Sequence, residues 1–265
     1  MRLHSCSNKL IINQYCKNQE HTLNQTNKQE APVALITGAA RRIGAEVARY
    51  LHKNGFRVVV HCHQSEDVAK ALAYELNQQR PDSAKVLRAD LSLAQSANTL
   101  IAESLRWAGR IDLLVNNASL FSRNDTDWDE MFNVNVKAPF LLSQAAFAAL
   151  KTVQGSIINI TDTHADRPLK GYAIYCQSKA ALSMQTKALA REFAPNVRVN
   201  AVAPGAIAWP EHANQLDAVQ QQHIINKTPL QRHGHPLFIA QAVFALAENQ
   251  FITGQTLCVD GGRSI

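Results

Sequence analysis

Residues 33–44 have the sequence VALITGAARRIG. The apolar run at 33–37 is typical of a buried parallel strand, and Gly38 opens a turn that leads into a helical pattern at 43–53. Such a turn lets the backbone pass close to a pyrophosphate, and Gly44 permits tight packing at the N-terminus of the helix. The helix dipole and the free N–H groups favour anions there. The stretch therefore predicts a nucleotide-binding strand, turn and helix.

Strand-like and helix-like segments alternate along the rest of the chain. Further strands are expected at 57–61, 84–89, 111–116, 156–161, 197–203 and 255–259. Helical patterns lie between most of them, at 66–79, 91–107, 128–150 and 172–193. Short β-branched strands separated by helices predict an α/β fold, a single doubly wound domain of the Rossmann type. Its parallel sheet is covered by helices on both faces, and ligands bind at the carboxyl ends of the strands.

The composition argues against several classes of protein. The chain has 265 residues and a net charge of +6, but its Lys and Arg residues form no basic stripe, so nucleic acid is not an expected partner. Its apolar stretches are far shorter than the roughly 20 residues that a membrane span needs, so no membrane association is expected. The five cysteines are odd in number and widely spread, which argues against a disulfide framework and for a reducing, cytoplasmic compartment.

Residues 1–30 differ from the remainder of the chain. They are rich in Asn, Gln, Lys and His, and they contain neither an amphipathic period nor the apolar region of a signal peptide. We expect a disordered extension there and a single folded domain at 31–265. Within this domain, residues from about 206 to 236 are expected to form a substrate loop, in which no motif fixes the roles of individual residues.

Tyr175 and Lys179 form the candidate catalytic pair. They are four residues apart, so on a helix they lie on the same face. A lysine ammonium beside a phenol favours the phenolate and lowers the tyrosine pKa from about 10 toward the working range. Such a tyrosine can deliver a proton while a nicotinamide delivers a hydride. Asp162, thirteen residues before the tyrosine, is a third candidate, and a helix-capping or turn role is its alternative.

The end of the second strand indicates which dinucleotide is bound. An acidic residue there would bind the ribose 2′-hydroxyl and repel a 2′-phosphate, but the first carboxylate in this segment is that of Glu66. Arg41, His63 and Ser65 can hold a phosphate together, so NADPH is expected rather than NADH. A pair of histidines on a strand could also bind a metal ion, but no third ligand stands nearby, so no metal is expected. The cofactor-binding positions expected in this segment are His61, His63, Gln64 and Ser65.

Further landmarks stand after the later strands and, for Asn135, on the expected helix at 128–150. They are Asp90 with Leu91, then Asn117 with Ala118 and Ser119, then Asn135, and finally Pro204 with Gly205. Together with the T-G-x(3)-R-x-G pattern at 37–44, they resemble the short-chain dehydrogenase/reductase superfamily over residues 32–265. The resemblance implies an NADP-binding reductase in which Asn135 supports Lys179 through a water molecule. The implied cofactor positions are Thr37, Gly38, Arg41, Arg42, Ile43, Gly44, Asp90, Leu91, Asn117, Ala118, Ser119, Tyr175, Lys179, Pro204 and Gly205.

Within this superfamily, the departures from the common pattern indicate one branch. Most members carry a serine at the position of Asp162, whereas a carboxylate can accept hydrogen bonds from the N–H groups of a nitrogen heterocycle. With Arg42, Ser119 and Phe121, Asp162 resembles the pteridine reductases, which reduce pterins and dihydrofolate with NADPH, and the bacterial dihydromonapterin reductases. One departure is Gln64, where well-studied members often carry an arginine that binds the 2′-phosphate.

The resemblance also implies a substrate position and an assembly. A pterin would lie between Phe121 and the nicotinamide, although Phe121 could instead be a hydrophobic anchor for its loop. A homotetramer is implied, with the helices at 128–150 and 172–193 at an interface. The implied substrate residues are Arg42, Ser119, Phe121, Asp162, Tyr175 and Trp209.

Two other functions stay open. One is a short-chain carbonyl reductase acting on a 3-oxoacyl thioester or a sugar ketone, against which Asp162 in place of serine and Arg42 in place of glycine argue. The other is a nucleotide-sensing protein that keeps the fold without turnover. A site without activity need not keep its catalytic residues. The sensing function is therefore disfavoured by the presence of all four of them, Asp162, Asn135, Tyr175 and Lys179.

Overall fold

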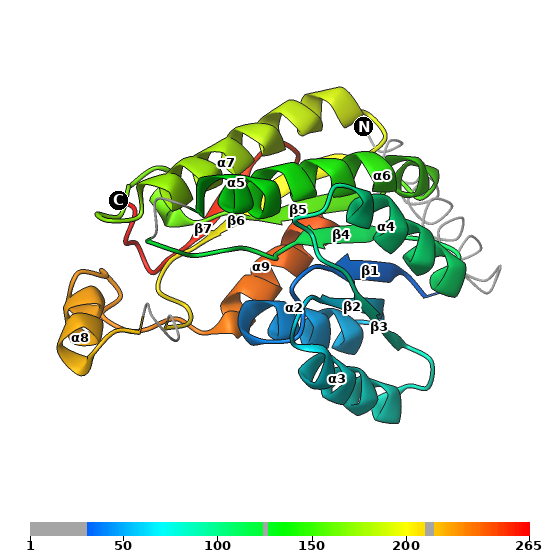
Figure 1. The fold of residues 1–265 in the computed structure, drawn as a ribbon, viewed down its shortest axis with the longest axis horizontal. Coiled ribbons are helices and arrows are strands. Elements are labelled where there is room, and N and C mark those ends of the chain that lie inside the picture. Colours follow the sequence, from blue (N-terminus) through cyan, green and yellow to red (C-terminus); the bar gives the residue numbers. More distant parts are fainter. Residues whose placement is uncertain (1–30, 124–126, 210–214) are drawn as a thin grey trace, which may run out of the picture. The chain divides into compact units, whose positions relative to one another are not determined.

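The computed structural model describes residues 31–123, 127–209 and 215–265, and the extension expected at 1–30 lies outside them. A seven-stranded parallel sheet has the strand order β3-β2-β1-β4-β5-β6-β7 (Figure 1). The chain builds outward from β1 in one direction and then returns to build outward in the other, which confirms the doubly wound fold. The strands are β1 Val33–Ile36, β2 Arg57–Cys62, β3 Ala84–Arg88, β4 Leu113–Asn116, β5 Ser156–Ile160, β6 Arg198–Pro204 and β7 Thr256–Val259.

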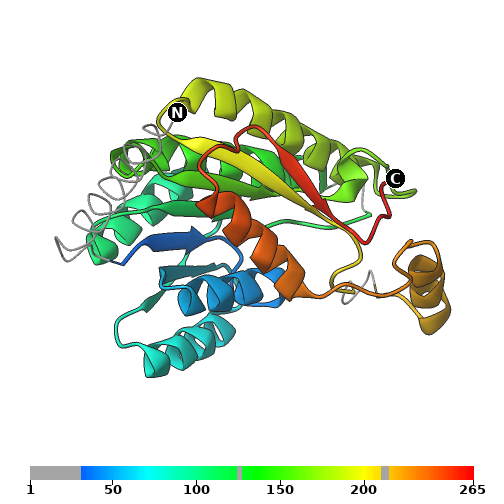
Figure 2. The same ribbon diagram turned by 180° about the vertical axis from the view of Figure 1, so that it is seen from behind.

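Helices cover both faces of this sheet (Figure 1, Figure 2). One face packs against α2 Arg42–Lys53, α3 Glu66–Gln79 and α9 Pro236–Glu248. The other packs against α4 Gln95–Ala108, α6 Ala138–Thr152 and α7 Ala173–Phe193. Successive side chains of a strand point to opposite faces, so Ala34 and Ile36 belong to the first core, whereas Val33 and Leu35 belong to the second. Burial on both faces explains why the strands are apolar runs rather than alternating patterns.

Helix α9 is an element that the sequence pattern did not predict. Its sequence, PLFIAQAVFALAE, begins with a proline in the first turn, where the missing N–H costs nothing. The segment is almost uniformly apolar, so its polar face is too narrow to give a clear period of 3.6 residues. It packs against α2, and Ile239 and Val243 are fully buried there.

The helix predicted at 128–150 consists of three helical segments. These are α5 Trp128–Phe132, a π-helical turn at Asn133–Lys137, and α6. Pro139 in the first turn of α6 has no N–H to donate, which favours a change of hydrogen-bond register just before it. Such π turns occur often at functional sites, and Asn135 lies in this one.

The sheet brings four strand ends to one edge. In the ladder, Ile36 of β1 is level with Val115 of β4, and Ile160 of β5 is level with Val202 of β6. The segments that follow these strands carry the glycine turn, the Asn-Asn-Ala-Ser sequence, Asp162 and the Pro-Gly pair. Helix α8 Ala218–Asn226 stands apart from the helices that cover the sheet and contains no buried residue (Figure 1, Figure 2). No helix in the described ranges is long and apolar enough to cross a membrane.

Candidate active site

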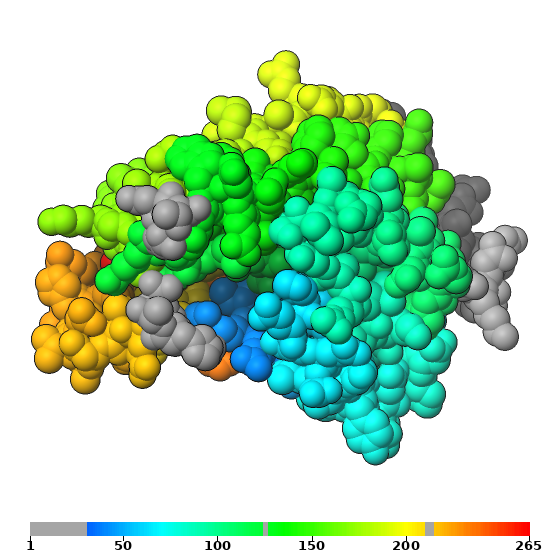
Figure 3. Space-filling view, viewed as in Figure 1, coloured from blue at the N-terminus to red at the C-terminus, as the bar shows by residue number. Residues whose placement is uncertain are grey.

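A pocket of about 630 Å³ lies at this edge of the sheet (Figure 3). Among the described residues that were expected at the site, Thr37, Gln64, Ser65 and Asn135 do not line it. The remaining predicted positions all do, and they are Gly38, Arg41, Arg42, Ile43, Gly44, His61, His63, Asp90, Leu91, Asn117, Ala118, Ser119, Phe121, Asp162, Tyr175, Lys179, Pro204, Gly205 and Trp209.

The glycine turn needs its glycines for close packing. Gly38 has a φ of +61°, and a Cβ atom there would stand 2.9 Å from the Cα of Ala118. A Cβ atom at Gly44 would stand 2.3 Å from the carbonyl oxygen of Gly38, so a side chain cannot be accommodated without movement of the turn. The Asn117 amide donates to the carbonyl oxygens of Thr37 (2.8 Å) and Gly38 (3.0 Å). These contacts hold the turn against the segment after β4.

Thr37 has a structural role in the same contact. Its side chain is buried, and its hydroxyl oxygen accepts the backbone N–H groups of Asn117 (2.9 Å) and Ala118 (3.0 Å). The threonine therefore ties the end of β1 to the end of β4 from below the pocket rather than from its wall.

The start of α2 fits the pyrophosphate of a dinucleotide. Arg41 is the N-cap residue, its side chain makes no capping hydrogen bond, and the first turn contains no acidic residue. The first N–H groups of the helix therefore remain available to an anion at the pocket wall, where Arg41 adds a positive charge. Glu66, the first carboxylate after β2, pairs with Lys70 at 2.7 Å and with Arg88 at 3.5 Å and does not line the pocket.

His61 supports the glycine turn from beneath. Its Nδ1 accepts the backbone N–H of Gly38 at 3.1 Å, so its Nε2 carries the proton and donates to the carbonyl oxygen of Ala89 at 3.1 Å. Burial lowers the pKa of His61 to about 4, and the ring is therefore neutral at physiological pH. Both ring nitrogens are used by the protein, which makes the expected contribution of His61 to cofactor binding indirect.

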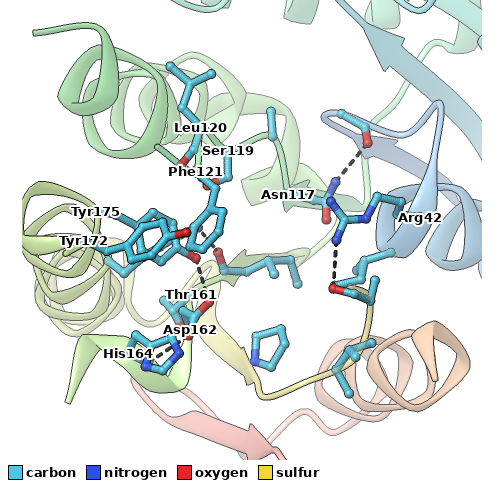
Figure 4. A pocket seen from close by; sticks show the side chains of 18 of the residues that line it. Arg42, Asn117, Ser119, Leu120, Phe121, Thr161, Asp162, His164, Tyr172 and Tyr175 are labelled. Atoms are coloured by element: carbon cyan, nitrogen blue, oxygen red, sulfur yellow. Dashed lines mark hydrogen bonds between the residues drawn. The ribbon is translucent and has the colours of Figure 1, made fainter. Parts of the chain in front are cut away.

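Asp162 and Tyr175 share a short hydrogen bond at the base of the pocket (Figure 4). The Tyr175 hydroxyl donates to Oδ2 of Asp162 at 2.6 Å. The other carboxylate oxygen, Oδ1, accepts the backbone N–H of His164 at 2.8 Å and thereby caps the short 3₁₀ helix Thr163–Ala165. The capping role considered for Asp162 is thus present together with the tyrosine contact, one oxygen serving each.

The lysine of the pair is placed below the tyrosine ring. Lys179 is buried, its Nζ donates to the carbonyl oxygen of Ile160 at 2.9 Å, and the same atom lies 5.8 Å from the centre of the Tyr175 ring. Burial lowers the pKa of Lys179 to about 8, and the charge of Asp162 opposes that shift. The ammonium form is therefore retained below about pH 8.

The tyrosine pKa shifts in the opposite direction to the one that the spacing predicts. Burial, followed by the charge of Asp162 and the hydrogen bond to it, raises the pKa of Tyr175 well above its usual value. A phenolate would be desolvated and would stand against a carboxylate, and both effects disfavour it. Tyr175 therefore keeps its proton at neutral pH.

Asn135 anchors the segment after β4. Its Oδ1 accepts the N–H of Leu120 at 2.8 Å, and its Nδ2 donates to the Leu120 carbonyl and to the Ser178 hydroxyl, each at 3.0 Å. The residue is fully buried in the π-helical turn. It thus joins the pocket wall to α7 immediately before Lys179, and its expected contact with the lysine through a water molecule stays a prediction.

Phe121 forms part of an aromatic cluster. Its ring stacks on that of Tyr172, with centres 4.4 Å apart, and meets the Tyr175 ring edge-on at 4.8 Å (Figure 4). Tyr172 was missed in the sequence; it is the N-cap residue of α7 and stands three residues before Tyr175. Other lining residues that carried no motif are Arg123, Glu130, Leu169, Lys170, Leu216, Ile224 and Arg263.

Arg42 connects the glycine turn to the segment after β6. Its backbone is left-handed, with a φ of 53°, a conformation that favours glycine. The side chain donates from Nη2 to the carbonyl oxygens of Ala208 (2.9 Å) and Trp209 (3.1 Å), as Figure 4 shows in part. The Trp209 ring in turn stacks on His233 at 4.3 Å. Arg42 therefore fixes the start of the expected substrate loop.

Comparisons with known proteins agree with this architecture. A family model described as Enoyl-(Acyl carrier protein) reductase matches residues 38–264. A solved structure, described as a blue fluorescent protein from a metagenomic library in complex with NADPH, superposes with a TM-score of 0.82 at 32% sequence identity. The match covers 88% of this chain and 98% of that one. The NADPH expected from the sequence agrees with the cofactor of this neighbour.

Curated relatives fall into two groups. A protein of Streptomyces violaceoruber described as a granaticin polyketide synthase ketoacyl reductase is 37% identical, with 91% of this chain and 99% of the relative covered. The 3-oxoacyl-[acyl-carrier-protein] reductase FabG of Rickettsia bellii is also 37% identical, with coverage of 86% and 95%. Pteridine reductase 1 of Leishmania tarentolae is 33% identical, with coverage of 91% and 99%. The chain therefore belongs to the short-chain dehydrogenase/reductase superfamily of NAD(P)-dependent oxidoreductases.

Proposed function

We propose that this protein reduces a pterin or dihydropterin with NADPH, by hydride transfer to a C=N bond of the ring. The observation that carries the proposal is the carboxylate of Asp162, which lines the pocket and binds the Tyr175 hydroxyl at 2.6 Å. A carboxylate only accepts hydrogen bonds when it is ionised, so it suits the amino and ring N–H groups of a pterin. A carbonyl substrate would need a donor at this position instead.

The cofactor would lie along the wall formed by the glycine turn. The N–H groups of α2 and Arg41 would hold its pyrophosphate, Asp90 and Leu91 would lie beside the adenosine, and Pro204 with Gly205 would lie beside the nicotinamide, because all of these residues line the pocket. NADPH, when bound, supplies the hydride. The NADPH-bound neighbour of the same fold supports this assignment.

Tyr175 is the proton donor in this proposal for a fully oxidised pterin. Its proton is held between the phenol oxygen and Asp162, and the raised pKa keeps it in place until a more basic ring nitrogen accepts it. The Lys179 ammonium lies 5.8 Å from the centre of the Tyr175 ring, and its charge favours the phenolate that forms when the proton leaves. For a 7,8-dihydropterin, the proton is proposed to come from water near Arg42.

The heterocycle is proposed to sit beside the aromatic cluster. Phe121 and Tyr172 both line the pocket, and an aromatic contact contributes roughly 0.5–1.5 kcal/mol beyond the area that it buries. Arg42 would reach the ring nitrogens and oxygen only after exchanging its present contacts with Ala208 and Trp209. We therefore infer that substrate binding loosens the start of the substrate loop.

A second candidate function is reduction of a 3-oxoacyl thioester. It is favoured by the ketoacyl reductase and FabG relatives, whose identity of 37% exceeds the 33% of pteridine reductase 1. NADPH oxidation would be measured with dihydrobiopterin, dihydrofolate and an acetoacetyl thioester in parallel. The pterin proposal requires the two pterins to give the higher kcat/KM, whereas turnover of the thioester alone would replace it with the second candidate.

We also propose that the protein is a homotetramer. Helices α6 and α7 expose large apolar side chains, of which Phe140 is 40% and Met184 is 64% accessible in the single chain. Burial of such side chains between subunits is favourable. Light scattering coupled to size-exclusion chromatography tests the proposal, because a monomer would contradict it, and Met184→Lys is expected to shift the population toward smaller species.

A further inference from the structure

The pocket contains more positive charge than the cofactor and the catalytic pair account for. Its charged lining residues are the cations Arg41, Arg42, Arg123, Lys170, Lys179 and Arg263 and the acids Asp90, Glu130 and Asp162. The first two arginines belong to the glycine turn, and Lys179 belongs to the catalytic pair. Three lining cations, Arg123, Lys170 and Arg263, remain without a role in cofactor binding or catalysis, and among the described residues Glu130 is the one lining acid besides Asp90 and Asp162.

These three cations come from segments far apart in the sequence. Arg123 follows β4, Lys170 precedes α7, and Arg263 follows β7. The Arg123 Nε donates to the Tyr172 hydroxyl at 2.7 Å, so its guanidinium lies at the end of the Phe121–Tyr172 stack. The fold thus brings three positive side chains to the lining of one pocket, and Arg123 borders the proposed heterocycle site.

Their charges are not compensated by the described part of the chain. Within residues 31–123, 127–209 and 215–265, every ion pair involves other cations, such as Arg49 with Glu75 and Lys70 with Glu66. Arg263 donates to the carbonyl oxygen of Ile224 at 3.4 Å, a contact that leaves its charge intact. Uncompensated cations around one cavity attract an anionic ligand group.

We propose that Arg123, Lys170 and Arg263 form a subsite for an anionic tail on the substrate. The inference rests on the proposed pterin reduction and makes it specific: the preferred substrate is a dihydropterin whose side chain ends in carboxylates, as the benzoylglutamate tail of dihydrofolate does. Dihydrobiopterin has a neutral side chain and would leave the three cations unused. An arginine binds a carboxylate through two parallel N–H groups, whereas a lysine contributes a point charge.

The test compares dihydrofolate with dihydrobiopterin, using the full-length protein and saturating NADPH. Wild type is expected to have the lower KM for dihydrofolate, and this advantage should shrink as salt is raised, because exposed charges are screened. In Lys170→Met and Lys170→Glu, the ratio of the two KM values should move against dihydrofolate by about three- to tenfold, the range that one or two exposed ion pairs supply. The charge reversal should have the larger effect. Arg263→Met should act in the same direction.

Lys85→Met is the matched control. Lys85 is an exposed lysine on β3 that does not line the pocket, so its loss changes the net charge equally and should leave the KM ratio unaltered. A ratio that is insensitive to salt and to both Lys170 variants would overturn the tail subsite, even if both pterins are reduced. If neither pterin is reduced by wild type, the proposed function itself fails, and the two failures are therefore distinguishable.

Discussion

The Tyr175 hydroxyl and Oδ2 of Asp162 are 2.6 Å apart, and the second oxygen of the same carboxylate is held by the N–H of His164. The carboxylate therefore cannot rotate freely, and the phenol proton has a fixed direction. Burial and the neighbouring charge keep that proton on the tyrosine by raising its pKa. A group that does not lose its proton to solvent over the working pH range is available as an acid throughout that range.

Removal of this proton donor should abolish most of the activity with oxidised pterin. Tyr175→Phe keeps the ring that contacts Phe121 but has no hydroxyl, so reduction of oxidised biopterin should fall at least about a hundredfold, a typical general-acid contribution. NADPH binding, followed by fluorescence titration, should persist. Turnover close to that of wild type would show that another group donates the proton.

The pKa of Lys179 predicts that kcat/KM decreases at alkaline pH. The pKa of Lys179 is about 8, so the ammonium is present below that pH and is lost as pH rises through it. If the charge favours the departing phenolate, kcat/KM for NADPH should fall about tenfold per pH unit above about pH 8. Lys179→Arg should move the break to higher pH because arginine stays protonated. A flat profile from pH 7 to 10 in wild type would contradict a role for the charge.

We expect the protein to prefer NADPH to NADH. Arg41 and His63 line the pocket, whereas Glu66 does not line it and forms ion pairs with Lys70 and Arg88. We expect kcat/KM for NADPH to exceed that for NADH by at least about tenfold, equivalent to about 1.4 kcal/mol. Gln64→Arg should tighten NADPH further by adding a charged phosphate partner. Equal kcat/KM values with the two cofactors in wild type would contradict this prediction.

The fold was predictable because the strands carry a strong local signal. Apolar runs such as residues 33–36 and 156–160 are buried on both faces, and each is followed by a turn and a helix. Helix α9 was not predicted, since its nearly uniform apolar sequence lacks the periodicity that marks a helix on a surface. The start of α4 at Gln95 rather than at 91 reflects Asp90, whose carboxylate accepts the N–H and hydroxyl of Ser92 and forms a turn there.

At the site, spacing located the residues but not their surroundings. The interval between Tyr175 and Lys179 placed both on one side of α7, as predicted, yet the tyrosine pKa moves up rather than down. The pKa depends on burial and on which charge contacts the hydroxyl, and neither is visible in an interval of four residues. His61 is a similar case, because its two hydrogen-bond partners come from distant strands.

The low pKa of His61 in the folded protein predicts that the protein loses stability as the pH falls. Its pKa is about 4 in the folded protein and about 6.5 when unfolded, so the unfolded chain binds the extra proton as pH falls from 6.5 toward 4. Through this group alone, the free energy of unfolding should be about 2 kcal/mol lower at pH 5 than at pH 7.5. His61→Gln can keep both hydrogen bonds without titrating. Urea unfolding at the two pH values should therefore show a smaller loss for the variant, and equal losses would rule the assignment out.

The last prediction separates the two candidate functions through Asp162. In Asp162→Ser, the short neutral hydroxyl cannot replace the charge-assisted acceptor and leaves the N–H groups of a bound pterin without a partner. The loss of charge should also lower the tyrosine pKa, because the Asp162 carboxylate contributes to raising it. The variant approaches the serine-tyrosine-lysine arrangement of carbonyl reductases. We therefore expect kcat/KM for dihydrobiopterin to fall by at least tenfold, about 1.4 kcal/mol, while any trace activity on a simple ketone holds or rises. If wild type ignores pterins and the serine variant only weakens an existing ketone activity, the protein is a carbonyl reductase.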